Sequence, residues 1–546
     1  MSPKQEAALP HRPVSPVIFR GEKDGELRQL GGIHHPWFFT ERPDHALLYS
    51  GKNNRGIPHK PIAYRLANDG STKVLDLTNL RPTNKDHIRL LELLTEEFRS
   101  EGWVCRYTGE EREAYSFIEG GDLYDYEGTG TGERWNRLFE IAFSEMEFDA
   151  VRLPDRTDGT QGAASIVWVT HRKDLLRPAT MGEELAALIH RPKDRDGFIE
   201  ESIQWPLIER WIEQQHPDLI ERIQRLTCID EDNRLDLLQE KIPARELRKI
   251  DRRIHQSVWR ALPNGTDIRP GDWVTLSRNY AQQHQRNDGD TVEQLQRVLA
   301  SDISWSGTDN NEFFYLPQAW VKPGITKWQD YLLALTPEQI QILCDGEMHE
   351  IRRHTPALRQ IQQAISADFN QEACGYYHGP DHWGRVSQHA VATARSLGIN
   401  PLIPHLFGMV HDSQREDEGH DPGHGPRAAA WVAEHAHDLF HFLSPQDIDL
   451  LALACELHSE GETEGPPQVQ ACWDADRLDL WRVDIAPDPR YLSCDYSKNP
   501  HVIADADRFM KRMPSHSCTG RLDAHEDCDL ADEDDDWGEE SGPAAA

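Results

Sequence analysis

The feature that most constrains the fold of this chain is a series of histidine and aspartate residues in its C-terminal third. In order, the series comprises His378, His382, the adjacent pair His411 and Asp412, His458, Asp474 and Asp476. An adjacent His-Asp pair can place an imidazole nitrogen and a carboxylate oxygen on one divalent cation, and a distant His and a distant Asp can complete an open coordination sphere. The series therefore predicts that these segments fold together around a metal site with room for water.

Two histidines at the start of the series are four residues apart. On a helix, His378 and His382 would project from one face, and one of them is enough for a ligand. The segment 382–386, His-Trp-Gly-Arg-Val, resembles the first motif of the HD superfamily of metal-dependent phosphohydrolases. This resemblance favours His382 as the ligand.

Two later segments resemble the same superfamily. Segment 410–412, Val-His-Asp, is similar to the pair that gives the family its name, and segment 475–479 is similar to its last motif, in which the Asp before Arg-Leu binds metal. That residue is Asp476 here. The resemblance implies an all-helical domain in which Asp412 is central to catalysis. It also implies hydrolysis of a phosphomonoester, a phosphodiester or a nucleotide.

Two further histidines stand where two-metal members of the superfamily carry extra ligands. His424 follows the His-Asp pair, and His458 precedes the final Asp. By this resemblance the expected cofactor is one or two divalent ions, either Mn, Mg or Fe, because two cations can hold both an attacking hydroxide and the phosphoryl oxygens. Asp474 is either a ligand or a residue that orients one.

Three basic residues near these motifs are candidates for contact with phosphate. Arg415 and Arg477 either bind phosphate or form ion pairs on a helix surface, and Lys498 is a weaker candidate.

A second resemblance lies upstream. The pieces are Val258-Trp-Arg, Gly271-Asp-Trp-Val-Thr-Leu-Ser and Asn311-Glu-Phe-Phe-Tyr, which together give an Arg, Ser, Glu succession. This succession resembles the ADP-ribosyltransferase fold. Carried over by position, Arg260 would hold the ribose and phosphate of NAD, Ser277 would shape the nicotinamide pocket, and Glu312 would stabilise the ribosyl cation.

One position departs from the transferase pattern. Two residues before the final Glu the family has Glu or Gln, whereas this chain has Asn310. The acceptor of ADP-ribose is therefore open, and a structural ion pair between the Arg and the Glu is the alternative.

The N-terminal part has strand and helix patterns. Short apolar runs at 37–39, 62–66 and 165–169 predict strands, and the spacing of apolar residues predicts a helix at 86–98 with Asp86 as its cap. This region is an expected α+β domain, either a divergent copy of the transferase fold or an unrelated one.

The middle of the chain contains both helix and strand patterns. Apolar residues three and four apart predict helices at 203–225 and 235–258, followed by strands at 271–277 and 312–317 around a helix at 280–285. After Pro337, long amphipathic stretches predict helices only.

The expected fold class is multidomain, with N-terminal α+β, ADP-ribosyltransferase-like regions followed by an all-α HD domain. The expected parts are a flexible segment (1–30), an α+β domain (31–192), a helical lead-in with the transferase-like module (193–330), the HD domain (331–500) and an acidic, largely disordered tail (501–546).

Composition restricts the partners. Lys and Arg number 59 against 93 Asp and Glu, which gives a net charge of -34 and argues against bulk nucleic acid as a partner. A small phosphorylated substrate remains possible because a bound cation reverses the local field. The nine scattered cysteines, the absence of an apolar run of about 18 residues and the polar start predict a cytoplasmic protein without a membrane span.

Three functions remain open from the sequence. The first is an HD phosphohydrolase fused to an NAD-binding module that ADP-ribosylates a protein target. The second is a nucleotide-sensing or interaction protein with inactive transferase-like domains. The third is an oxidase with a di-iron centre in the same helical ligand set.

Overall fold

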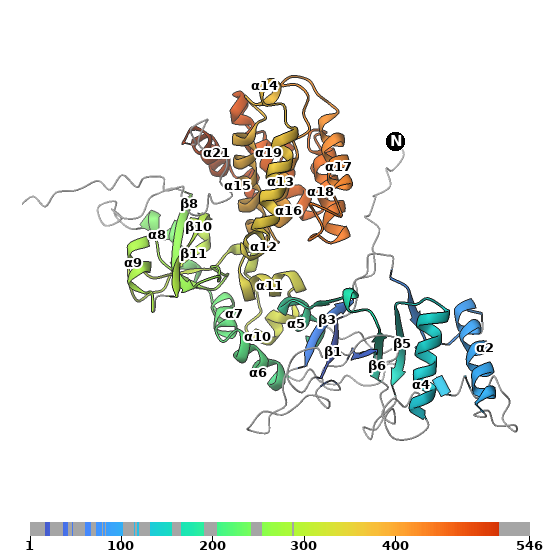
Figure 1. Cartoon of the computed structure of the whole chain (residues 1–546). Coiled ribbons are helices and arrows are strands. Elements are labelled where there is room, and N and C mark those ends of the chain that lie inside the picture. The colour runs from blue at the N-terminus through green and yellow to red at the C-terminus, as the bar shows by residue number, and fades with distance from the viewer. Residues whose placement is uncertain are drawn as a thin grey trace, which may run out of the picture. The chain divides into compact units, whose positions relative to one another are not determined.

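A computed structural model places the chain in two compact units, Met1–Pro217 and Asp218–Ala546. The structure describes residues 17–21, 36–41, 46, 61–66, 72–78, 80–81, 83–101, 114, 117–118, 131–155, 165–189, 205–241, 254–286 and 289–512. The first unit is a mixed α/β region and the second ends in a helical part (Figure 1). The mixed fold class is therefore confirmed at this coarse level.

The first unit contains a seven-stranded sheet in the order β4-β5-β6-β2-β1-β3-β7. Its strands are β1 (Val17–Arg20), β2 (Trp37–Thr40), β3 (Ile62–Leu66), β4 (Val74–Asp76), β5 (Ala150–Asp155), β6 (Ser165–Thr170) and β7 (Leu176–Pro178). β4 and β5 are parallel, and the other pairs are antiparallel. The prediction that residues 1–30 form a flexible segment is wrong for β1, because this strand lies inside the sheet with Ile18 and Phe19 buried.

Helices complete the first unit. They are α2 (Lys85–Ser100), α4 (Thr131–Glu140), the π-helical turn η2 (Ile141–Glu145), the 3₁₀ turn η3 (Lys173–Leu175), α5 (Met181–Ile189) and α6 (Trp205–Gln215). Leu94, Phe98 and Trp135 are buried in the core that α2 and α4 share with the sheet. The cap of α2 is Asn84 rather than Asp86, because the Asn84 side chain accepts hydrogen bonds from two backbone N–H groups of the first turn.

The second unit begins with short helices and two small sheets. The elements are α7 (Leu219–Thr227), η4 (Glu231–Asn233), α8 (Leu235–Lys241), β8 (His255–Pro263), β9 (Trp273–Val274), α9 (Arg278–Gln283), β10 (Asp290–Leu299), η5 (Ala300–Asp302), β11 (Ile303–Trp305), β12 (Phe313–Tyr315) and η6 (Gln318–Trp320). β8 pairs with β10, and β9 and β11 flank β12.

Two helix predictions for this region need correction. The expected helix at 203–225 is interrupted between α6 and α7, where Pro217 cannot donate a backbone hydrogen bond. The expected helix at 235–258 ends as α8 before the gap in the described residues, and Val258 lies in β8 instead. Val258 is fully buried in a strand that pairs along its length with β10, and the helix-like spacing did not reveal that pairing.

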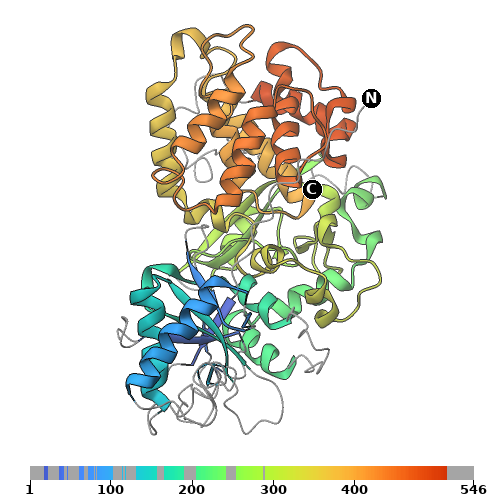
Figure 2. The same ribbon diagram turned by 90° about the vertical axis from the view of Figure 1, so that its right-hand side faces the viewer.

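The rest of the second unit is helical, as the sequence predicts. Its elements are α10 (Trp328–Leu333), α11 (Pro337–Asp345), α12 (His349–Arg353), α13 (Thr355–Asp368), α14 (Gln371–Cys374), α15 (Pro380–Leu397), α16 (Leu402–Val410), α17 (His424–Glu434), α18 (Pro445–Leu457), α19 (Pro467–Leu478), η7 (Asp479–Val483), η8 (Pro489–Tyr491), α20 (Asp495–Lys498) and α21 (Pro500–Arg512). Helices α15, α16, α18 and α19 pack against one another, and α17 packs on α18 (Figures 1 and 2).

The start of the expected tail is also corrected. Residues 501–512 belong to α21, and Val502 and Ala506 pack with Leu478 and Leu492 in a buried cluster. The acidic run that motivated the tail prediction begins further on, and residues 513–546 lie outside the described part of the chain.

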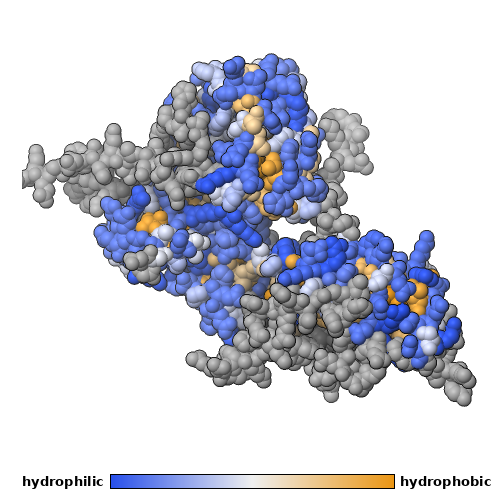
Figure 3. Space-filling model, viewed as in Figure 1, coloured by the Kyte–Doolittle hydropathy of each residue, from blue (hydrophilic) through white to orange (hydrophobic). Residues whose placement is uncertain are grey.

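The surface seen in Figure 3 is mostly hydrophilic over the described residues, with apolar residues in small separate spots. Among the described helices, none is long and apolar enough to cross a membrane.

Candidate metal centre

Six predicted ligands come together in the helical bundle. His382 lies in the first turn of α15, His411 and Asp412 follow α16, His424 begins α17, His458 follows α18, and Asp476 lies near the end of α19. The four histidines and Asp412 are each at most 4% exposed. Five segments of the chain thus deliver their polar side chains to one buried point.

Two glycines let neighbouring helices approach closely enough for this. A Cβ on Gly408 in α16 would collide with the backbone and side chain of Ser387 in α15. A Cβ on Gly425 in α17 would lie 2.7 Å from the carbonyl oxygen of Cys455 in α18. Each close contact joins two helices that together supply a pair of histidine ligands.

All four imidazole rings are fixed in one orientation. The Nδ1 atoms of His411, His424 and His458 contact the backbone carbonyl oxygens of Phe407, Asp421 and Cys455, respectively. A carbonyl oxygen can only accept, so each of these Nδ1 atoms carries the hydrogen. The Nε2 lone pair of each neutral ring therefore points into the centre, which is the orientation that metal-binding histidines adopt.

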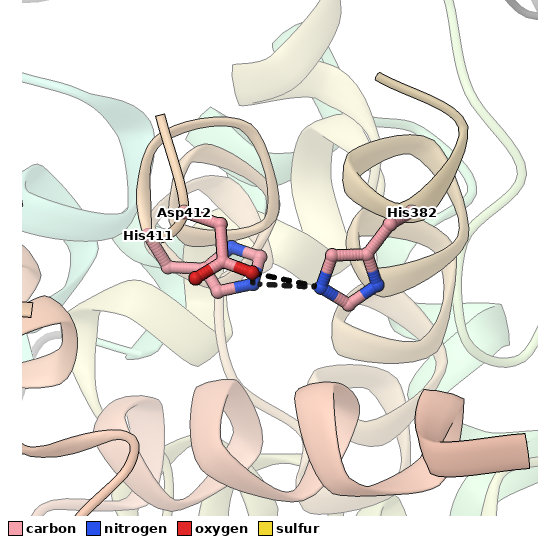
Figure 4. A group of neighbouring side chains, drawn as sticks. All are labelled: His382, His411 and Asp412. Atoms are coloured by element: carbon pink, nitrogen blue, oxygen red, sulfur yellow. Dashed lines mark hydrogen bonds and ion pairs between the residues drawn. The ribbon is translucent and has the colours of Figure 1, made fainter. Parts of the chain in front are cut away.

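The first group of donors lies between α15, α16 and α19. His382 Nε2 is 3.1 Å from His411 Nε2 and 3.4 Å from an oxygen of Asp412, and Figure 4 shows these three side chains converging. Asp476 Oδ1 is also 3.4 Å from His382 Nε2, and within the described structure no hydrogen bond satisfies this buried oxygen. Two imidazoles and two carboxylates thus face one point.

The second group uses the other oxygen of the same aspartate. Asp412 Oδ1 lies 3.3 Å from His424 Nε2 and 3.6 Å from His458 Nε2, and these two nitrogens are 2.8 Å apart. The two groups, His382, His411 and Asp412 on one side and Asp412, His424 and His458 on the other, each have the spacing to hold a metal ion. Asp412 is placed to bridge the two positions.

The buried charges of this cluster shift one another's pKa values. Burial raises the pKa of Asp412, but the charge of His411 and hydrogen bonds from His382 and His458 hold it well below its usual range. Burial lowers the pKa of His382, but its bonds to carboxylates raise it to about 9. Burial and the neighbouring ring lower the pKa of His424 to about 4.

Each histidine pair combines a ring with a raised pKa and a ring with a lowered one. The pKa of His411 is lowered by burial, and that of His458 is raised because Asp412 outweighs burial. The two Nε2 atoms of each pair face one another, 3.1 Å apart for His382 and His411 and 2.8 Å apart for His424 and His458. Because a metal ligand must be deprotonated, a cation bound at either point would compete with protons for these nitrogens.

Asp479, which the sequence did not identify as part of the site, orients His382. Its Oδ2 accepts a hydrogen bond from His382 Nδ1 at 2.7 Å, and both of its oxygens accept from Arg385. A carboxylate on the far nitrogen fixes the tautomer of a ligand and raises its basicity. The available signal was its place in the last motif, three residues after Asp476.

A cavity of about 450 Å³ opens onto the centre. Its lining includes Asp412, His424, His458, Asp476 and the three arginines Arg415, Arg477 and Arg482. The Nη2 atom of Arg477 is buried and has no hydrogen-bond partner within the described structure, although its Nη1 donates to the carbonyl oxygen of Tyr491. The arrangement presents positive charge beside the carboxylates and imidazoles.

Three candidates from the sequence lie outside the centre. His378 precedes α15 instead of sharing its face, because the helix begins at Pro380, and its Nδ1 bonds to Glu418. Asp474 accepts the backbone N–H groups of Ser493 and Cys494 and so fixes the segment after η8. Lys498 donates to the Ser493 carbonyl oxygen.

The three residues expected from the second resemblance are each held by a nearby residue. Arg260 forms a 2.8 Å ion pair with Asp272. Ser277 caps α9 by accepting from the Tyr280 backbone N–H, and the Tyr280 hydroxyl donates to Glu312 at 3.4 Å. Tyr280 therefore contacts both Ser277 and Glu312, whereas Arg260 pairs with Asp272.

Comparison of the chain with protein-family models, with curated proteins and with solved structures found no match.

Proposed function

We propose that this chain is a metal-dependent phosphohydrolase that acts on a nucleotide or another phosphate ester. The observation that carries the proposal is the convergence of four imidazole Nε2 atoms and two carboxylates at a cavity lined by three arginines. Buried nitrogen lone pairs that face one another are unfavourable unless a cation or a proton lies between them. This supports metal binding, and the arginines support an anionic substrate.

The donor set favours some metals over others. Imidazole is a good ligand for iron, zinc and related transition metals, whereas Mg²⁺ prefers oxygen ligands and retains water. Four imidazoles with two carboxylates therefore favour Mn²⁺ or iron among the ions expected from the sequence. When bound, such cations would lower the pKa of a water molecule and shield the charge of phosphate.

The protein residues have distinct roles in this proposal. His382, His411, Asp412 and Asp476 would hold one ion, and Asp412, His424 and His458 would hold a second. Arg415 Nη1 lies 3.4 Å from Asp412 Oδ1, at the edge between the ligands and the cavity. Arg477 also lines the cavity and would contact the oxygens of a phosphoryl group there.

A di-iron oxidase would use the same six side chains. The three cavity arginines favour the phosphohydrolase, because an oxidase does not require an anionic substrate. Iron content and oxygen consumption of protein purified under reducing conditions would identify an oxidase.

The test is a substrate screen with Mn²⁺ or Mg²⁺. Deoxynucleoside and nucleoside triphosphates, cyclic nucleotides and phosphomonoesters are assayed for released phosphate or nucleoside. We expect turnover by the wild type and by the surface control Asp495→Asn, and none by Asp412→Ala. Turnover that persists in Asp412→Ala would overturn the proposal.

Transferase activity is a second candidate, and the link from Ser277 through Tyr280 to Glu312 favours it. The aromatic rings of Trp273, Tyr280 and His284 also pack against one another at tilted angles beside this link, with ring centroids 4.6 to 6.1 Å apart. Incubation with labelled NAD and candidate proteins should give a product that Glu312→Ala abolishes. Equal labelling by the variant would exclude a catalytic role for Glu312.

A further inference from the structure

Exposed apolar and aromatic side chains lie in the cavity lining and beside one of its arginines. Among the described residues, seven large hydrophobic or aromatic side chains are exposed, and two of them, Ile485 (53% exposed) and Tyr491 (55%), line the cavity. Two others, Tyr376 (85%) and Tyr377 (39%), are neighbours in sequence, and the Tyr377 carbonyl oxygen is bonded to the lining residue Arg482. Exposed apolar residues normally occur singly on a surface, so this grouping calls for a function.

Two cavity arginines hold the backbone of the exposed tyrosines. Arg482 Nε donates to the Tyr377 carbonyl oxygen at 3.1 Å, and Arg477 Nη1 donates to the Tyr491 carbonyl oxygen at 2.5 Å. Tyr491 itself lines the cavity together with Ile485. The tyrosines are therefore fixed relative to the guanidinium groups while their rings remain open to solvent.

The first pair of tyrosines is fixed at a second point. One oxygen of Glu418 accepts the backbone N–H groups of Tyr376 and Tyr377, at 2.6 and 2.9 Å. The rings of these tyrosines meet edge to face, with centroids 4.6 Å apart. A rigid backbone lowers the entropic cost of binding to such rings.

These observations favour a substrate that is larger than a small phosphomonoester. The volume of the cavity suits a ligand of about one nucleotide. Aromatic rings outside it can stack on further bases, because every base has a flat face. Arginines that line the cavity, two of them bonded to the backbone of exposed tyrosines, suit the alternation of phosphates and bases along a single strand.

We propose that the substrate is a short single-stranded oligonucleotide, with one phosphodiester at the cavity and flanking bases on Tyr376, Tyr377 and Tyr491. This inference rests on the proposed hydrolase function and names its substrate class. The reaction consumes one water molecule, whose oxygen bonds to phosphorus while one P–O ester bond breaks. The departing nucleoside oxygen leaves with a proton, and the other product is a phosphomonoester.

The net charge of -34 does not exclude such a substrate. Charges more than about 10 Å away are largely screened at 0.1 M salt, and the strand would contact Arg415, Arg477 and Arg482 directly. The acidic composition argues against long duplexes, which require an extended positive surface.

Binding can be tested without hydrolysis. A fluorescein-labelled deoxyadenosine tetranucleotide is titrated with the full chain in EDTA, and fluorescence anisotropy is followed. We expect Tyr491→Ala and Tyr376→Ala each to weaken binding by roughly tenfold, since one stacked base is lost. Tyr491→Phe and Tyr376→Phe keep the ring and should bind like the wild type. Wild-type affinity in both Ala variants would overturn the proposal.

Hydrolysis separates this inference from the proposed function. With Mn²⁺, the wild type should cleave the tetranucleotide, and Tyr376→Ala should raise KM for it, whereas Tyr376→Phe, which keeps the ring, should have the wild-type KM. Cleavage of mononucleotides alone would overturn the oligonucleotide inference and support the hydrolase. Absence of hydrolysis with either substrate, despite ring-dependent binding, would overturn the hydrolase and make this surface a binding site only.

Discussion

At the scale of single residues, the centre depends on hydrogen bonds that turn four imidazole rings inward. Three Nδ1 atoms donate to backbone carbonyl oxygens of the residues' own helices or turns, and the fourth, in His382, donates to Asp479. The backbone bonds form wherever these helices form. The bond to Asp479 is different, because it is made by one side chain and a single substitution can remove it.

Asp479→Asn tests this bond. An amide in place of the carboxylate weakens the hold on His382 and on Arg385, so we expect Mn²⁺ affinity to fall by about 10–100-fold. Isothermal titration with Mn²⁺ gives the measurement, with the exposed Asp495→Asn as the matched control. Affinity equal to that of the wild type would show that Asp479 does not orient His382.

The acid stability of the bundle should depend on a buried histidine away from the centre. Burial and the nearby charge of Arg297 lower the pKa of His389 from 6.5 to about 3. The folded state therefore resists protonation, and the stability that the neutral ring contributes above pH 6.5 is lost as the pH falls toward 3.

His389→Phe should reduce this loss, because phenylalanine does not titrate. Between pH 6.5 and the acid transition, the free energy of unfolding should fall less steeply in the variant than in the wild type. The two slopes should differ by up to about 1.4 kcal/mol per pH unit. Urea unfolding at several pH values measures the slope. His441→Phe, at an exposed position, should keep the wild-type slope; an unchanged slope in His389→Phe would show that His389 does not titrate in this way.

At the scale of elements, the site requires close helix packing at two glycines. Gly408→Ala should push α16 from α15 and cost about 1–3 kcal/mol of stability, with weaker Mn²⁺ binding, because the new Cβ meets the backbone of Ser387. Gly384→Ala is the matched control. It lies inside α15 with nothing within 4 Å of the new Cβ, and we expect it to stabilise by about 0.5–1 kcal/mol. Thermal unfolding and Mn²⁺ titration distinguish these outcomes, and equal behaviour of both variants would exclude the packing argument.

The sequence predicted the helical elements of this part well and the strands less well. Segment 445–457 reads as an amphipathic helix and forms α18 with Ser444 as its cap, because local spacing and capping determine such an element. β10 was not predicted, since its alternation includes polar residues and a register shift between Leu295 and Val298. The pairing of β10 with β8 is a long-range property that a local pattern does not contain.

In the candidate site, too, the sequence predicted what local patterns contain and missed what depends on long-range contacts. The six candidate ligands were predicted because their residue types and order are visible in the sequence, and the structure brings all six together. Asp479 and Arg482 were missed because their roles depend on the turn η7 folding back over α15 and Tyr377. A charged residue that orients a ligand has no separate sequence signal.

At the scale of the second unit, a buried polar network connects the small sheets to the helical bundle. Arg395 of α15 bonds to Glu347 at 2.8 Å and to the carbonyl oxygen of Gln296 in β10, and Tyr315 of β12 donates to the same Glu347. His255 of β8 contacts Asp505 of α21 at 2.7 Å. Helix α15, which carries His382, is thus also held in place by contacts with the small sheets.

Arg395→Met tests this connection. Removing the cation leaves Glu347 buried without its partner, and we expect a loss of about 3–5 kcal/mol. The double variant Arg395→Met/Glu347→Gln removes both charges and should recover part of the loss. Urea unfolding of the wild type, Arg395→Met, Glu347→Gln and the double variant measures the coupling energy between the two residues. Strictly additive effects on the unfolding free energy would contradict a direct interaction.

We propose that the six side chains bind two divalent ions through a shared Asp412. The most direct measurement is metal content per chain after equilibrium dialysis against Mn²⁺, for the wild type, Asp476→Ala, His458→Ala and Asp412→Ala. We predict two ions in the wild type, one in each of the first two variants, and none in Asp412→Ala. A wild type that retains no metal, or an Asp412→Ala variant with wild-type content, would contradict the account.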